Sequence, residues 1–415
     1  MNWILTLIGS REHYAVPRAF SRRGRLLRLY TDAWCSFGRG LLRRGPQSMR
    51  ALAGRYHSEI PSDRVTAFTC RALLDRLGRP ADTSVEGAHL EFVRMGKQFC
   101  QAVNGDLAKR MLDPQNMSFY GYDTGCLETM QMLRERGLFC VVNQIDPARE
   151  EEGMVLEEVR RWPGWEKVEG RKPEVYWERL EQEWKLADAV VVNSQWSRDA
   201  LVKQGVAEEK IVVIPLAYED SARLVVTEKK PGPLQVLWLG NVILRKGIQY
   251  LVEAAKFLPL EDVRITVAGP IGISPEAVQS APSNVKLIGR VTRDEAARIY
   301  AEADLFVLPT ISDGFAITQL EAMGHGLPVI TTPNCGKVVT DGVDGMIIPI
   351  RDAKALGNAI MCFANDRKML GAASEAAKAK SKEFSIDHLS RWLEQLDELA
   401  EARRGRHSMV EMNPR

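Results

Sequence analysis

Residues 304–331 read DLFVLPTISDGFAITQLEAMGHGLPVIT, and this stretch decides the fold. The apolar run at 304–309 predicts a buried strand, and a second apolar run at 328–331 predicts another. The pattern between them is helical, and Gly326 followed by Pro328 ends that helix. Strand, loop, helix and strand in this order form a parallel α/β unit.

Two carboxylates, Asp313 and Glu321, frame the start of this helix. The first turn of a helix offers unpaired N–H groups and a partial positive charge, so residues 315–318 are expected to cradle phosphate oxygens. Asp313 would then accept hydrogen bonds from hydroxyl groups just outside the helix. Glu321, about two turns further along, would reach another part of the same ligand. The plain alternative is a loop acid and a glutamate on a helix surface.

The spacing of a carboxylate, seven residues and a glutamate resembles the signature of glycosyltransferase family four, retaining enzymes of the GT-B fold. Gly-Phe follows the first acid, and Ala-Met-x-x-Gly-Leu-Pro-Val-Ile follows the second. The resemblance implies that Asp313 touches the transferred sugar, that the intervening amides hold the diphosphate, and that Glu321 binds the ribose. Those amides belong to Gly314, Phe315, Ala316, Ile317 and Thr318. The chain departs from the family at Asp313, where Glu is usual, and at Ala316, where Gly is usual.

A second motif, GNVILRKG at 240–247, follows a predicted strand and opens a helix. A glycine turn with a cation at the helix start suits a pyrophosphate. The family pattern is Gly-Arg, four residues and Lys-Gly, so the resemblance implies that Lys246 binds the diphosphate. Asn241 stands where Arg is usual, and Arg245 is expected to supply the missing charge.

Two further segments are candidates for donor binding. Arg290 and Val291 follow a predicted strand at 285–288, where family members hold the nucleotide base with backbone groups; an ordinary strand end is the alternative. Gly9 lies in the loop after the first strand, which the family places against the donor, and glycine permits a close backbone approach. His13 in the same loop would bind donor or acceptor, or is simply solvated.

The segment 141–147, VVNQIDP, ends another strand at the same predicted edge. Many family members carry a histidine near this place, and here Gln144 and Asp146 are the polar substitutes that would contact sugar or acceptor. Asp146 precedes a proline and can equally be a turn residue. Ser194 or Ser197 is expected to cap a helix late in the first half. In the second half, Thr292 with Glu295 three residues later predicts a capping box at a helix start.

The chain of 415 residues exceeds what one core usually supports, which predicts two domains. Apolar runs alternate with helical patterns, so the fold class is α/β, and the resemblance implies GT-B: two Rossmann-like, doubly wound domains that face across a cleft. The predicted domains are 1–222, which would bind the acceptor, and 232–385, which would bind the nucleotide sugar. A helix at about 386–405 is expected to pack back on the first domain. Residues 40–136 have mostly helical patterns.

Composition excludes some classes of function. Hydrophobic residues make up 45% and charged residues 27%, and a net charge of +2 gives no global argument for binding nucleic acid. Seven cysteines without a C-x-x-C pair indicate a reducing compartment, and nothing approaches 18 uninterrupted apolar residues. A cytoplasmic protein is expected.

Residues 1–60 are strongly basic, with eleven arginines and three acids. The arginines are Arg11, Arg18, Arg22, Arg23, Arg25, Arg28, Arg39, Arg43, Arg44, Arg50 and Arg55. Such a stretch, mixed with Leu, Trp and Phe, can rest on the anionic inner face of a membrane, which would make the protein peripheral there. A solvated basic face and a groove for an anionic acceptor are the alternatives.

No metal site or cofactor is expected. The sequence has no Asp-x-Asp pair and no clustered His/Cys set, and its six histidines are dispersed. Charge on the leaving diphosphate would therefore be neutralised by Lys246, Arg245 and helix N-termini.

The resemblance implies a retaining, metal-independent transfer of a sugar from a UDP-, GDP- or similar nucleotide sugar to an acceptor hydroxyl. The acceptor would be a glycan or a lipid-linked glycan, as in polysaccharide biosynthesis. Two alternatives remain at this point: a nucleotide-sugar epimerase of the same architecture, and a non-catalytic nucleotide-sugar-binding protein.

Overall fold

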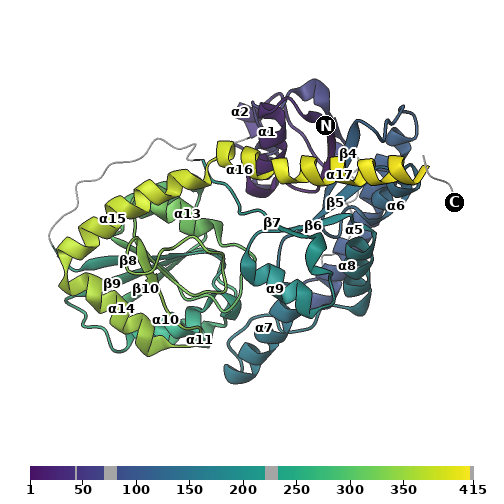
Figure 1. Cartoon of the computed structure of the whole chain (residues 1–415). Coiled ribbons are helices and arrows are strands. Elements are labelled where there is room, and N and C mark those ends of the chain that lie inside the picture. The colour runs from purple at the N-terminus through teal and green to yellow at the C-terminus, as the bar shows by residue number, and fades with distance from the viewer. Residues whose placement is uncertain (43, 70–81, 220–231, 412–415) are drawn as a thin grey trace.

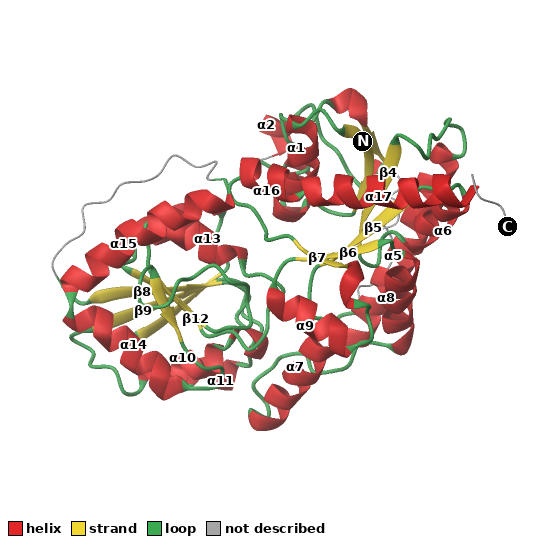
Figure 2. Ribbon diagram, in the orientation of Figure 1, coloured by secondary structure: helices red, strands yellow, loops and turns green. Residues whose placement is uncertain are grey.

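The computed structural model describes residues 1–42, 44–69, 82–219 and 232–411. The predicted domain boundary at 222–232 lies almost wholly outside these ranges, as do Arg43 and Cys70. The described chain forms two α/β lobes, each with a central sheet that helices cover on both faces (Figure 1, Figure 2).

Both sheets are parallel in every strand pairing that the described residues make. The first has the order β3-β2-β1-β4-β5-β6-β7 and the second β10-β9-β8-β11-β12-β13. The first sheet consists of β1 (Asn2–Leu7), β2 (Leu26–Thr31), β3 (Val65–Ala67), β4 (Met117–Tyr122), β5 (Phe139–Gln144), β6 (Ala189–Val192) and β7 (Ile211–Val213). The second consists of β8 (Leu234–Leu239), β9 (Val263–Ala268), β10 (Val285–Gly289), β11 (Leu305–Leu308), β12 (Val329–Thr331) and β13 (Gly345–Ile347).

Helices connect the strands. The first half contains α1 (Ala15–Arg22), α2 (Arg39–Leu42), α3 (Gln47–Ala53), α5 (Val85–Leu107), α6 (Leu127–Glu135), α7 (Arg149–Arg161), α8 (Glu174–Leu186) and α9 (Gln195–Lys203). The second half contains α10 (Ile248–Ala255), α11 (Pro275–Gln279), α12 (Arg293–Glu302), α13 (Ile317–Gly324), α14 (Ala353–Asn365), α15 (Arg367–Ser381), α16 (Ile386–Trp392) and α17 (Glu394–Glu411).

The strand order reverses between β1 and β4 in the first sheet and between β8 and β11 in the second. In open parallel sheets, ligands bind beyond the carboxyl ends of the strands at such a switch point. The loops after β8 and β11 are the two segments that carry the sequence motifs, Lys246 and Asp313. The topology therefore brings these motifs side by side.

The strands expected in the second half agree with the structure to within a residue or two, because strands such as β11 are buried on both faces and form continuous apolar runs. The predicted capping box of Thr292 and Glu295 is present at α12, and Ser194 caps α9. The helical interpretation of 40–136 was incomplete, since the region contains β3 and the central strand β4. The β4 sequence, MSFYGY, mixes small, polar and aromatic residues, so no clear period reveals it.

The C-terminal segment crosses back onto the first domain as two helices, α16 and α17 (Figure 1). Leu389, Leu393 and Leu396 lie in the same buried cluster as Trp3 and Phe20. A hydrogen bond also joins the C-terminal helices to the first strand, since the Trp3 indole N–H donates to Asp397 Oδ1 at 2.7 Å.

Helix α7 belongs to the first half of the sequence but packs against the second domain. Glu158 on this helix is fully buried. Its Oε2 accepts hydrogen bonds from Gln249 Nε2 and Tyr250 Oη, both at 2.8 Å, and its Oε1 accepts one from Arg351 Nε at 2.6 Å. A desolvated carboxylate needs such partners, so α7 is fastened to the second domain by its C-terminal half.

The segment after α7 continues this attachment. The Lys167 N–H donates to the Gly272 carbonyl at 2.9 Å, and the Ser274 N–H donates to the Trp165 carbonyl at 2.6 Å. These bonds surround an antiparallel bridge between Glu166 and Ile273. The stretch from α7 to about residue 168 is therefore an arm of the first domain that lies on the second.

We expect Glu158→Ala to lower the free energy of unfolding by about 3–5 kcal/mol, because it leaves the Arg351 charge and two further donors without their buried acceptor. Urea unfolding measures this loss. Glu157→Ala is the matched control: Glu157 also pairs with Arg351, at 2.7 Å, but its side chain is 38% exposed, so a much smaller loss is expected. Equal losses in the two variants would contradict the fastening role of Glu158.

Candidate active site

Loops at the carboxyl edges of the two sheets are in contact with each other. An added Cβ at Gly314, in the loop after β11, would lie 1.9 Å from the carbonyl oxygen of Ile145, in the loop after β5. Only glycine lets these two loops approach so closely. The first-domain loop therefore rests directly on the segment between Asp313 and the start of α13.

Asp313 is held by two cations. Its Oδ2 contacts Lys246 Nζ, and its Oδ1 lies 3.5 Å from Arg245 Nη1. Burial by itself raises the pKa of Asp313, but Lys246 and Arg245 outweigh burial and leave that pKa below its ordinary value. Asp313 is therefore a carboxylate at neutral pH, and an incoming phosphate would compete with it for Lys246.

The turn that carries Lys246 depends on Gly247. Its φ is +77°, and an added Cβ would lie 1.8 Å from the Pro309 carbonyl oxygen at the end of β11. This left-handed turn lets the loop after β8 lie against the end of β11. Lys246 and Asp313, 67 residues apart in the chain, meet for this reason.

Arg245 points toward the first domain. Its Nη1 donates to Glu151 Oε2 on α7 at 3.2 Å and to the Ser312 carbonyl at 3.1 Å. The Ser312 hydroxyl donates to the same Glu151 oxygen at 3.0 Å. Arg245 therefore lies beside Asp313 as expected, but part of its charge is used across the domain interface.

The helix start has fewer open amides than the sequence indicates. The Ala316 N–H donates to the Cys335 carbonyl at 3.1 Å, so it does not face a ligand. The Phe315 side chain is buried against Phe384. Ala316 is the N-cap and has no side chain that could accept from the first turn, so the amides of Ile317 and Thr318 stay available to an anion.

Glu321 is positioned by residues that the sequence did not single out. The Tyr300 hydroxyl donates to Glu321 Oε2 at 3.0 Å, and the Tyr300 ring stacks on His325 with centroids 4.9 Å apart. Burial raises the pKa of Glu321 above its ordinary value, against the opposing effects of Tyr300, Arg293 and His325. Nothing in a helix pattern indicates that Tyr300, on the neighbouring α12, orients this carboxylate.

His13 reaches across the interface. Its Nδ1 accepts from Arg293 Nη2 at 2.8 Å, at the start of α12 in the second domain. Desolvation and the positive charge of Arg293 lower the pKa of His13 to about 4, so the ring is neutral at pH 7. Glu12, His13 and Tyr14 all have positive φ, at 49°, 52° and 62°, a strained run of the kind found at functional sites.

The remaining first-domain candidates are largely used within the fold. The Gly9 N–H donates to Asp32 Oδ1 at 2.8 Å, and Gly9 has a φ of +99°. Gln144 is fully buried: Trp184 Nε1 donates to its Oε1 at 2.9 Å, and its Nε2 donates to Asp146 Oδ1 at 3.0 Å. Gln144 therefore does not face the cleft, contrary to expectation. Asp146 Oδ1 also accepts the Ala148 N–H at 2.9 Å, which is the turn role that the sequence left open.

In the second domain, Asn241 and Arg290 are exposed at the carboxyl ends of β8 and β10, and Val291 follows β10. Their expected contacts with the donor stay predictions. Among the residues that the structure describes, no three or more His, Cys, Asp or Glu side chains are grouped so that they could hold a metal ion. No described helix is long and apolar enough to cross a membrane.

Residues 233–366 match the family model described as Glycosyl transferases group 1. The chain is 25% identical over 206 residues to the amylovoran biosynthesis glycosyltransferase AmsK of Erwinia amylovora, covering 46% of this chain and 51% of AmsK. It is 27% identical over 227 residues to a D-inositol 3-phosphate glycosyltransferase of Xylanimonas cellulosilytica, covering 48% of this chain and 54% of that protein. The chain thus spans about half the length of these relatives.

Solved structures match across both domains. Sucrose-phosphate synthase from Thermosynechococcus elongatus superposes with a TM-score of 0.68 at 16% identity, covering 97% of this chain and 100% of that one. Anabaena HepE in complex with UDP gives a TM-score of 0.61 at 16% identity, covering 95% and 99%. The fold is GT-B, as predicted. The family match lies in the GT-B domain that carries Lys246, Asp313 and Glu321.

We expect Gly314→Ala to destabilise the closed arrangement of the GT-B domains by about 1–3 kcal/mol, because the methyl group meets the Ile145 backbone rather than a flexible side chain. Small-angle scattering should detect a larger radius of gyration. Gly105→Ala is the control, since no heavy atom lies within 4 Å of a Cβ there. An unchanged radius for Gly314→Ala would show that this contact does not govern closure.

Proposed function

We propose that the protein transfers a sugar from a nucleoside diphosphate sugar to an acceptor hydroxyl, with retention at the anomeric carbon and without a metal. The observation that carries the proposal is the contact between Lys246 and Asp313 at the facing edges of two GT-B domains. The family match over residues 233–366 and the UDP held by Anabaena HepE support a nucleotide-sugar donor.

In this proposal the diphosphate takes Lys246 away from Asp313. The phosphate oxygens bind Lys246 Nζ and the first turn of α13, where N–H groups and the helix dipole favour negative charge. Asp313, freed from Lys246 and still near Arg245, then accepts hydrogen bonds from sugar hydroxyls. Glu321, oriented by Tyr300, accepts from the ribose.

The bond between the anomeric carbon and the diphosphate oxygen breaks as the acceptor oxygen bonds to the same face of that carbon. The acceptor proton passes to the leaving diphosphate. Positive charge develops on the sugar and negative charge on the diphosphate, and the nearby carboxylate and the lysine stabilise these respectively. The contact of the loops at Gly314 and Ile145 would exclude water that could otherwise hydrolyse the donor.

The acceptor in this proposal is a glycan or lipid-linked glycan, in keeping with relatives such as AmsK, which is named for amylovoran biosynthesis. A cytoplasmic protein that touches the inner membrane face would meet such an acceptor. The surface for that contact lies near α2, where Phe37 is 89% exposed and Leu41 74% exposed. Arg44 and Arg50 are exposed on the adjoining α2–α3 segment.

Much of the basic N-terminal region is neutralised within the protein. Arg18 and Arg22 both pair with Glu59 and Glu219, and Arg23 pairs with Asp397 at 2.7 Å. Arg23 thereby joins the first domain to the C-terminal helix α17, and Arg18 and Arg22 join it to Glu219 in the segment after β7. The proposed membrane contact therefore rests mainly on the α2–α3 segment.

Lys246→Ala is expected to reduce nucleotide release from the preferred donor about 10²–10³-fold, the usual effect of losing one charge-stabilising donor. A panel of nucleotide sugars with chromatographic detection of free nucleotide measures it. Lys256→Ala serves as the control, because Lys256 is exposed and pairs with Glu253 away from the cleft. If the protein bound nucleotide sugars but released nucleotide from none of them, it would be a non-catalytic nucleotide-sugar-binding protein and not an enzyme.

Replacing Phe37 and Leu41 together by Ser should weaken binding to anionic liposomes at least about tenfold, because each apolar side chain loses its burial in the acyl boundary. Flotation at low salt measures the bound fraction. Phe257→Ser, at a residue 73% exposed in the second domain, should leave flotation unchanged. The proposed membrane contact would be wrong if the wild-type protein did not float, or if all three proteins floated equally.

A further inference from the structure

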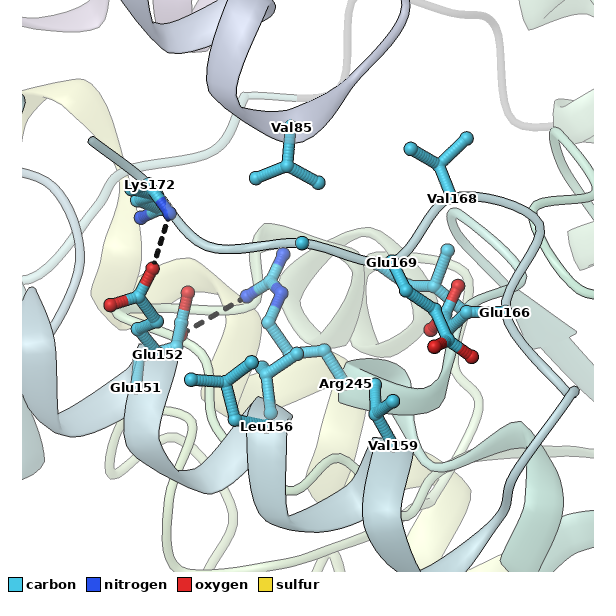
Figure 3. A pocket seen from close by; sticks show the side chains of 13 residues that line it. Val85, Glu151, Glu152, Leu156, Val159, Glu166, Val168, Glu169, Lys172 and Arg245 are labelled. Carbon is cyan, nitrogen blue, oxygen red and sulfur yellow. Dashed lines mark hydrogen bonds and ion pairs between the residues drawn. The ribbon is translucent and has the colours of Figure 1, made fainter.

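A cavity of about 340 Å³ lies between the arm and the rest of the molecule. Its walls come from α7, from residues 166–172 after it, from the N-terminal end of α5 and from the loop after β8 (Figure 3). Both domains thus contribute to it. Its volume suits a ligand about the size of a sugar with a short aliphatic extension.

One side of the cavity is aliphatic. Val155, Leu156 and Val159 line it from α7, and Val85 lies opposite Leu156 and Val159 at the start of α5 (Figure 3). Ile243 adds an apolar wall from the second domain. Methyl groups from both sides favour a ligand with an apolar part, since a fully hydrated ligand would gain nothing from them.

The polar lining is acidic. Four glutamates and two cations line the cavity, and both cations have other carboxylates beside them. Arg245 is shared between Glu151 and Asp313, and Lys172 lies 3.9 Å from Asp146. An anionic ligand would be repelled here.

Two of the glutamates have no cationic partner. No ion pair joins Glu166 or Glu169 to another residue in the described part of the chain, and their carboxylates lie next to each other at one end of the cavity (Figure 3). Glu166 Oε1 accepts only the Leu244 N–H, at 2.6 Å. Burial, with Glu169 adding to it, raises the pKa of Glu166, against the opposing effects of the Leu244 N–H and the charge of Arg245.

The cavity adjoins the proposed reaction centre. Arg245 forms part of its wall, and the same guanidinium lies 3.5 Å from Asp313 Oδ1. Glu151 connects the two places from the other side, through the Ser312 hydroxyl. The Arg245 side chain thus lies between a ligand in the cavity and Asp313.

We infer that this cavity binds the acceptor, and that the acceptor carries a cationic amine beside an aliphatic portion, with the amine between Glu166 and Glu169. The identification of this ligand as the acceptor rests on the proposed function, whereas the binding of an amine in the cavity does not. The amine supplies the counter-charge that the two carboxylates lack, and the aliphatic portion lies along Val155 and Val159. A hydroxyl of the same molecule then extends past Arg245 toward the donor.

The test compares two probes, the propyl glycoside of glucosamine and the propyl glycoside of N-acetylglucosamine, which differ by one positive charge. Calorimetric titration of the full chain should give at least about tenfold tighter binding of the amine, as a charge-assisted hydrogen bond provides. The double substitution Glu166→Gln and Glu169→Gln should abolish this preference, whereas Glu178→Gln, at an exposed residue of α8 outside the cavity, should keep it. Equal affinities for the two probes, or a preference that survives the double substitution, would overturn the inference.

Folding of the variants is checked by thermal unfolding. If the double variant is unfolded, Glu169→Gln alone replaces it, because this side chain is exposed and its loss of charge should still reduce the preference several-fold. Donor binding and nucleotide release are measured on the same samples. If the protein prefers the amine but releases nucleotide from no donor, the proposed function is wrong and the cavity is still a cation site. If it releases nucleotide but does not prefer the amine, the proposed function stands and the inference about the cavity is wrong.

Discussion

The buried carboxylate of Glu158 is the contact on which the arrangement of the two domains depends. A charge removed from water must be compensated by hydrogen bonds, and here Gln249, Tyr250 and Arg351 of the second domain supply them. Glu158 thereby fixes α7, whose other end carries Glu151. Glu151 in turn orients Arg245 beside Asp313. One helix therefore transmits the domain interface to the candidate active site.

The same principle governs the site itself, where carboxylates and cations are balanced with few charges to spare. Asp313 is in contact with Lys246, so the donor diphosphate of the proposed function would have to displace this contact. This exchange would link donor binding to the release of Asp313 for the sugar. Further along the arm the balance fails, because Glu166 and Glu169 have no cationic partner among the described residues. The direction of that imbalance indicates the charge of the ligand that we infer for the cavity.

The local sequence was sufficient to predict those features of the candidate site that depend on neighbours in the chain. The motif around Asp313, the Lys246 turn and the cap at Thr292 lie where their patterns predicted, because strand ends, glycine turns and helix starts are local features. Strand β4 was missed because its pattern is mixed. Glu151 was missed for a different reason: in the sequence it is one acid of three at a helix start, where a solvated position is the ordinary expectation.

The sequence by itself determined the fold class, the two-domain plan and the identity of Asp313, Glu321 and Lys246 as the candidate donor site. Only the tertiary structure decided which charges remain available: Arg18, Arg22 and Arg245 are paired with distant acids, Gln144 is buried, and two glutamates of the arm face a cavity without a counter-charge. The physical reason is that the state of a charge depends on its burial and on the charges near it in space. Those partners lie as far as 365 residues away in the chain, as Asp387 does from Arg22, so no local pattern records them.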